Sequence, residues 1–140
     1  VGVHPHEAKD HLHVTPEVLI DLAGRPRVVG IGECGLDFHY DLSPRDQQET
    51  VFRTHIAAAR RTGLPLVVHT READDRMGAI LREEAVEGPF RFLMHCYTSG
   101  AELSEQAAEM GAWFSVSGIA TFKAAEDVRT VIRAMPADRI

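Results

Sequence analysis

Three residues of the kinds that bind divalent metals stand at equivalent places in the chain. Glu33 lies in VVGIGECGLDFHY, His69 in LVVHTREA and His95 in FLMHCYTSG. Each is at or just past the end of a short apolar segment typical of a β-strand, and a helical pattern follows. In α/β proteins the loops after the carboxyl ends of parallel strands gather on one rim, where such folds carry out their chemistry. We therefore predict that one carboxylate and two imidazoles meet there as the metal ligands of a hydrolase.

Each of the three residues also has an ordinary structural explanation when it is taken alone. Glu33 can cap a helix or pair with an arginine, and a single histidine such as His69 or His95 is more often a hydrogen-bonded core residue than a ligand. Together they favour a metal site, because an unpaired polar group in a crowded rim costs several kcal/mol. A single Glu can also bridge two metal ions about 3.5 to 4 Å apart.

Two further residues near these segments can contribute to a site. Arg71, two residues after His69, is a candidate for binding an anion, since a guanidinium matches phosphate oxygens in a bidentate manner. A salt bridge to a neighbouring carboxylate (Glu72, Asp74 or Asp75) explains it equally well. Asp37 can orient a ligand histidine or cap the following turn, and capping is the favoured interpretation.

Other histidines match a bare HxH spacing without a convincing context. His4 and His6 flank Pro5, which interrupts regular strand pairing, although His6 can approach the rim because it follows a strand-like segment. His11 and His13 fall in a polar loop. Metal binding by these four histidines is therefore disfavoured.

The two cysteines, Cys34 and Cys96, each directly follow a proposed ligand. Because successive side chains of a strand point to opposite faces, we expect both thiols to point away from the ligands. They are interpreted as small reduced side chains packed outside the site, which suits a cytoplasmic protein.

The chain repeats one unit: a short apolar strand, a polar loop, an amphipathic helix and a Gly or Pro break. Five strands are predicted, at residues 1–3, 28–31, 66–68, 92–94 and 113–116. The longest helix is predicted to open at Ser43-Pro44, with Ser43 as its cap, and to end at Gly63. Ser99-Gly-Ala-Glu102 predicts a second capping box. Continuous apolar strands alternating with helices indicate a parallel sheet buried on both faces.

Two α/β architectures fit this order: an open doubly wound sheet, or part of a (β/α)8 TIM barrel. The chain has neither a GxGxxG turn nor a GxxxxGK[ST] loop, which disfavours the nucleotide-binding open sheets. A complete barrel needs about 250 residues. The 140 residues are therefore expected to form a single domain, 1–140, holding about five of eight units and truncated at both ends.

Composition narrows the possible functions. With 44% hydrophobic residues the chain can fill one core, and no apolar run approaches the roughly 18 residues of a membrane span. We expect no membrane association and no protein partner. A net charge of −6 argues against binding nucleic acid through a broad basic surface. It leaves a nuclease open, because metal ions and a few arginines can hold phosphate in a locally positive site.

Several segments, in order, resemble the TatD family of metal-dependent deoxyribonucleases. They are GVHPHEA, VGIGECGLDFHY, SPRDQQETVFRTHIAAARRTGLPLVVHTREA, MHCYTSG and FSVSGIATFK, and they cover nearly the whole chain. The resemblance implies a TIM barrel of the amidohydrolase type, one to three divalent ions such as Mg2+, Mn2+ or Zn2+, and phosphodiester hydrolysis with DNA as substrate. It also implies that Glu33 is a bridging carboxylate and that His69 and His95 are imidazole ligands.

Two elements of the family pattern are absent from these 140 residues. The resemblance implies that the HxH ligand pair of the family's first strand lies upstream of GVHPHEA and that the metal-binding Asp, the family's general base, lies beyond Ile140. No catalytic residue is therefore assigned within the chain, and we expect it alone to bind metal weakly and to turn over little. Two alternatives remain open: an amidohydrolase-type enzyme acting on a small amide, ester or lactone, and a non-catalytic remnant.

Overall fold

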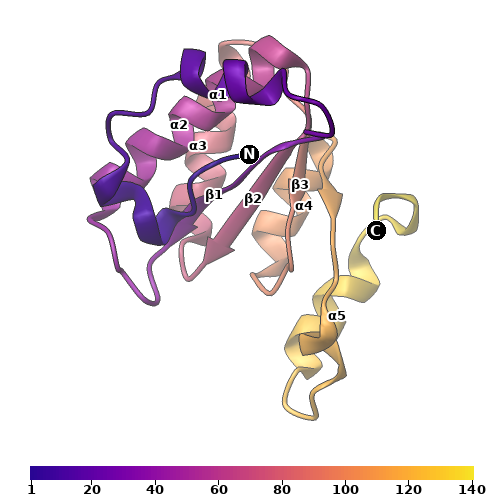
Figure 1. Cartoon of the computed structure of the whole chain (residues 1–140). Helices are drawn as coiled ribbons and strands as arrows, with labels where there is room; N and C mark the ends of the chain where they lie inside the picture. The colour runs from indigo at the N-terminus through magenta and orange to yellow at the C-terminus, as the bar shows by residue number, and fades with distance from the viewer.

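The computed structural model describes all 140 residues and centres on a four-stranded parallel sheet (Figure 1). The strands lie side by side in chain order: β1 (Ile31–Asp37), β2 (Leu66–Arg71), β3 (Phe92–Met94) and β4 (Trp113–Phe114). Neighbouring strands that run parallel and follow one another in sequence require a connection that crosses over the sheet. Each connection here contains one helix, so the carboxyl ends of all four strands point to the same rim.

Five α-helices accompany the sheet, together with three short 3-10 helices. They are α1 (Pro16–Ala23), α2 (Arg45–Thr62), α3 (Asp74–Val86), α4 (Ala101–Glu109) and α5 (Glu126–Ala134), with η1 (Pro5–Asp10), η2 (Gly118–Thr121) and η3 (Ala137–Arg139). Figure 1 shows α5, drawn in yellow, extending away from the sheet. None of the helices combines the length and the apolar character needed to cross a bilayer.

The longest helix ends as predicted, but it does not begin as predicted. Gly63 follows α2 in the left-handed conformation (φ 70°), which a glycine adopts without steric cost. At the other end Pro44 occupies the N-cap position, and Ser43 donates a hydrogen bond to the His6 carbonyl instead of capping the helix. The capping box predicted at Ser99 is also wrong, since Gly100 occupies the N-cap position of α4.

The strand predicted at residues 28–31 is misplaced. Ladder pairing with β2 starts at Ile31 and runs to Asp37, and Val29 is 78% exposed. Residues 1–3 are not assigned as a strand, but they run beside the start of β1. The Val1 amino group donates to the Gly30 carbonyl at 3.0 Å, and the Gly32 N–H donates to the Val1 carbonyl at 2.7 Å.

A bulge at Glu33 determines which side chains of β1 face the core. Gly32 pairs with Val67 and Cys34 pairs with Val68, so Glu33 is an extra residue without a partner of its own in β2. The bulge shifts the alternation of side chains by one residue, so Cys34 and Leu36 join the core. Glu33 therefore does not point into the core. Its carboxylate contacts His69, as does that of Asp37.

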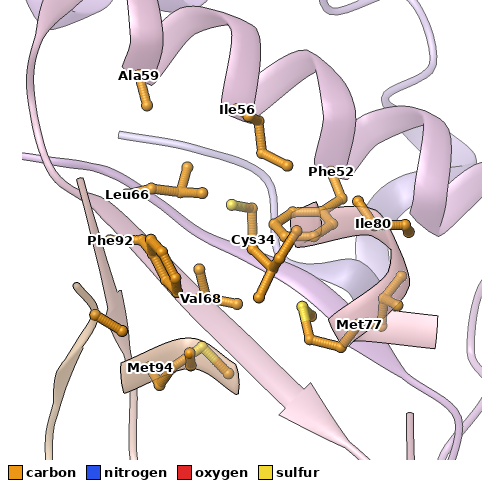
Figure 2. Packing of buried hydrophobic residues seen from close by; sticks show 14 of the residues in the cluster. Cys34, Phe52, Ile56, Ala59, Leu66, Val68, Met77, Ile80, Phe92 and Met94 are labelled. Atoms are coloured by element: carbon orange, nitrogen blue, oxygen red, sulfur yellow. The ribbon is translucent and has the colours of Figure 1, made fainter. Parts of the chain in front are cut away.

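The hydrophobic core lies between one face of the sheet and the helices (Figure 2). Side chains from α2 and α3 pack there against those of β2 and β3: Phe52, Ile56, Met77 and Ile80 against Leu66, Val68, Phe92 and Met94. Burial alternates along β2 and β3, and Trp113 of β4 is 50% exposed. In this chain the helices therefore bury one face of the sheet, and the second face is partly exposed.

Candidate metal centre

The structure brings the three predicted ligands together around one carboxylate oxygen. Glu33 Oε1 lies 3.2 Å from Nδ1 of His69 and 3.2 Å from Nδ1 of His95. Glu33 and His69 belong to β1 and β2, whereas His95 follows the last residue of β3. Gly35 permits the close approach of the first two strands, because a Cβ at this position would lie 2.0 Å from the His69 carbonyl oxygen.

Asp37 performs the two roles that the sequence left open. Its Oδ1 accepts hydrogen bonds from the backbone N–H groups of His39 and Tyr40 and so caps the turn after β1. Its Oδ2 lies 3.1 Å from His69 Nε2 and 2.8 Å from His6 Nε2. Burial alone would raise the pKa of Asp37, but these hydrogen bonds outweigh it and lower the pKa to about 2. The carboxylate is therefore charged at neutral pH.

His4 and His6 join the cluster, although the sequence disfavoured them. One nitrogen from each of His4, His6 and His69 lies within 4.8 Å of the other two. The imidazole rings of His4 and His69 are 4.7 Å apart. Pro5 begins η1 directly after His4, so the HPH segment turns at the rim and does not continue as a strand. Burial, together with the neighbouring imidazoles of His69 and His6, lowers the pKa of His4, which favours the neutral form that binds metal.

A buried histidine outside the cluster anchors the HPH segment. His55 of α2 is fully buried, and its Nδ1 lies 2.7 Å from the Val51 carbonyl oxygen. Its Nε2 accepts the backbone N–H of Val3 at 2.8 Å, directly before His4. Burial lowers the pKa of His55 to about 4. The contact joins positions 52 residues apart, a separation over which local sequence patterns carry no information.

The donor set fits a divalent cation. Two ligand atoms that share an ion at about 2.1 Å lie about 3.0 to 3.4 Å apart for octahedral or tetrahedral angles. The distances of 3.2 Å from Glu33 Oε1 to the two imidazoles match this separation. The hydrogen bond from His69 to Asp37 is the outer contact that usually orients a ligand histidine. Each imidazole is therefore at a ligand-sharing distance from Glu33 Oε1, whereas the three residues whose ligand atoms all lie within 4.8 Å of one another are His4, His6 and His69.

Arg71 stands at the edge of this cluster without a carboxylate partner. The cluster opens into a pocket of about 510 Å3, whose lining includes Glu33, His69, His95 and Arg71. The Arg71 guanidinium lies over the Tyr40 ring, 4.7 Å from its centroid. The salt-bridge interpretation of Arg71 is wrong, since its neighbouring carboxylates have other partners or none. The guanidinium is therefore available to an anion in the pocket.

The two cysteines differ in position. Cys34 is fully buried, and burial raises the pKa of its thiol, as expected for a packed side chain outside the site. Cys96 instead lines the pocket, with Sγ 2.9 Å from Ser117 Oγ. Its backbone adopts a left-handed conformation (φ 48°) directly after His95. This turn returns the side chain to the rim, so the expectation for Cys96 is wrong.

The fold and the polar rim define the class to which the chain belongs: a parallel α/β protein with metal-ligand side chains clustered at its strand ends. A family model described as TatD related DNase matches residues 1–140. The chain belongs to this TatD family.

Individual relatives agree with this assignment. An uncharacterized metal-dependent hydrolase, YabD of Bacillus subtilis, is 38% identical over 140 residues, covering 100% of this chain and 54% of the relative. A protein of Klebsiella pneumoniae named 3'-5' ssDNA/RNA exonuclease TatD is 32% identical, covering 99% of this chain and 53% of the relative. The crystal structure of YjjV, a TatD homologue from Escherichia coli, superposes with a TM-score of 0.84 at 26% identity, covering 97% of this chain and 52% of that one.

The chain spans about half the length of the curated relatives it matches. Its four parallel strands are part of a TIM barrel, the fold of the TatD structures it resembles. In a closed barrel the inward-pointing side chains of different strands pack against one another. The uncovered second face of the sheet, which carries Trp113, corresponds to this interior.

Proposed function

We propose that this chain carries part of the metal site of a nuclease that hydrolyses phosphodiester bonds of single-stranded DNA. One observation carries the proposal: Glu33 Oε1 in β1 lies 3.2 Å from an imidazole nitrogen of His69 in β2 and 3.2 Å from one of His95, directly after β3. The names of relatives as metal-dependent hydrolases and as a 3'-5' ssDNA/RNA exonuclease support this reaction class.

Glu33, His69 and His95 would hold the metal, which lowers the pKa of a bound water so that hydroxide becomes available near neutral pH. The two imidazoles of the donor set favour Zn2+ over Mg2+, while the carboxylate is a ligand that Mn2+ also accepts. Asp37 accepts a hydrogen bond from His69 Nε2, and this fixes the tautomer in which Nδ1 keeps its lone pair toward Glu33.

Arg71 would bind the phosphate of the substrate. Its guanidinium lies on the wall of the pocket that contains the ligands, and its position over Tyr40 holds it in place. The paired N–H donors of a guanidinium balance the negative charge on the equatorial phosphate oxygens when the phosphodiester is attacked. The positive charge of Arg71 would allow a protein with a net charge of −6 to bind the phosphate of DNA at this pocket.

Hydrolysis of a 5'-labelled single-stranded DNA under enzyme excess tests the proposal, since single-turnover conditions reveal slow cleavage. With Mn2+ we expect shortened products from the unmodified chain and at least a hundredfold slower cleavage in Glu33→Gln. Glu7→Gln, at an exposed position of η1, is the matched control and should cleave as the unmodified chain does. Because the chain spans about half the length of its relatives, the result that would contradict a nuclease centred on this carboxylate is cleavage that persists undiminished in Glu33→Gln.

A further inference from the structure

A second cavity adjoins the pocket of the metal ligands. It has a volume of about 600 Å3 and lies between the β2–α3 connection and the loop before α4. Arg71 and Thr98 line both cavities. A phosphate bound by Arg71 therefore stands at their common edge, and the group attached to that phosphate can extend into the second cavity. Its volume lies in the range of small-molecule binding sites.

The walls of the second cavity are held by contacts within the chain. Asp74 Oδ2 accepts the backbone N–H of Gly100 at 2.8 Å, which joins the start of α3 to the start of α4. Arg76 also lines the cavity, but its guanidinium donates to the carboxylate of Glu49 at 2.8 and 2.6 Å. The charge of Arg76 is thus already paired, and Arg71 is the one free cation of the cavity.

The remaining polar groups of the cavity are mainly hydrogen-bond acceptors. Asp75 is exposed and forms neither a hydrogen bond nor a salt bridge, and the Glu72 carboxylate contacts only His39 Nδ1, at 2.7 Å. These carboxylates repel a second phosphate but accept hydrogen bonds from neutral donors. Phe38 adds an apolar wall to the cavity, and because the Arg45 guanidinium covers one face of its ring, 4.3 Å from the centroid, a base would pack against the part of the ring that Arg45 does not cover.

We propose that this second cavity binds the nucleoside attached to the phosphate held by Arg71, with its base against Phe38 and facing Asp75. A carboxylate accepts from the exocyclic amino groups of cytosine, adenine and guanine, whereas the only base donor of thymine is N3–H, which lies between two carbonyl oxygens that the carboxylate repels. The cavity therefore selects nucleotides with amino-bearing bases over thymidine nucleotides. This inference rests on the proposed function, since Arg71 is taken to bind the phosphate.

Binding measured by NMR titration of the 15N-labelled chain tests the inference without requiring turnover. The probes are dCMP, TMP, deoxycytidine and inorganic phosphate, followed at the backbone amides of residues 98–100 and at the side-chain Nε–H of Arg71. We expect dCMP to bind about tenfold more tightly than TMP, the effect of one good hydrogen bond. Asp75→Asn should reduce this ratio to within about twofold and leave phosphate binding unchanged. Asp127→Asn, on exposed α5, is the control and should keep the tenfold ratio.

The probes separate failure of the cavity from failure of the nuclease proposal. Equal affinities of dCMP, TMP and inorganic phosphate would overturn the nucleoside cavity while leaving phosphate binding by Arg71 intact. If phosphate leaves the Arg71 signal unmoved but deoxycytidine shifts residues 98–100, the cavity stands and the role of Arg71 in the proposed function fails. An unchanged dCMP to TMP ratio in Asp75→Asn would overturn the assignment of base selection to this carboxylate.

Discussion

His55 should account for much of the loss of stability on mild acidification. Its Nε2 accepts the Val3 N–H in a fully buried position, so only the neutral imidazole fits. The pKa falls from 6.5 in the unfolded chain to about 4 in the folded protein. Because the folded pKa is depressed, this contribution is complete above pH 6.5 and is lost as the pH falls toward 4. Between pH 7 and pH 5 the loss amounts to about 2 kcal/mol.

Urea unfolding measured at pH 7 and pH 5 provides the test, with the free energy of unfolding compared between the unmodified chain and His55→Gln. Glutamine keeps an acceptor for the Val3 N–H but does not titrate. The variant should therefore lose about 2 kcal/mol less than the unmodified chain over this interval. Asp37, whose pKa is about 2, stays charged in the folded protein between pH 7 and pH 5 and does not contribute to this difference.

His13 supplies the control for this experiment. It is exposed, so His13→Gln should keep the pH dependence of the unmodified chain. If His55→Gln shows the same loss between pH 7 and pH 5 as the unmodified chain, the neutral buried imidazole is not the anchor of the HPH segment, and the reasoning from its burial is refuted.

Three further results are expected. Asp37→Asn removes the charged acceptor of His69 and should weaken Mn2+ affinity by about 10 to 100-fold in calorimetry; unchanged affinity would show that Asp37 only caps its turn. Phe52→Ala should cost about 3 to 5 kcal/mol in urea unfolding, whereas Val29→Ala, at an exposed site, should stay within about 0.5 kcal/mol. Arg71→Gln should abolish phosphate binding and leave Mn2+ affinity intact; a fall in both would indicate a structural role.

That Glu33, His69 and His95 come from three neighbouring strands could be predicted from chain order, although Glu33 and His69 lie within β1 and β2 and not at or past their ends as predicted. Parallel strands connected by helices place their carboxyl ends on one rim, whatever the details of packing. The precise place of Glu33 could not be predicted, since the bulge that turns it from the core depends on how β1 pairs with β2. The misplaced strand at residues 28–31 has the same origin: apolar residues indicated a strand, but pairing selected the glycine-rich segment that follows.

The participation of His4 and His6 could not be predicted for a related reason. Their contacts to His69 and Asp37 join residues more than 30 positions apart, and local spacing carries no information on such distances. Pro5 suggests a break in a strand when only the sequence is considered, whereas in the structure it starts the 3-10 helix η1 directly after His4. A proline at a first helical position is a recognisable signal, and it would have located the turn.

A crystal structure of the chain soaked with Mn2+, with anomalous scattering used to locate the ion, tests the central claim most directly. We predict an anomalous peak at about 2.0 to 2.3 Å from a Glu33 carboxylate oxygen and from one ring nitrogen each of His69 and His95. The absence of a peak at saturating Mn2+, or a peak that none of these three side chains contacts, would contradict a metal centre at this rim.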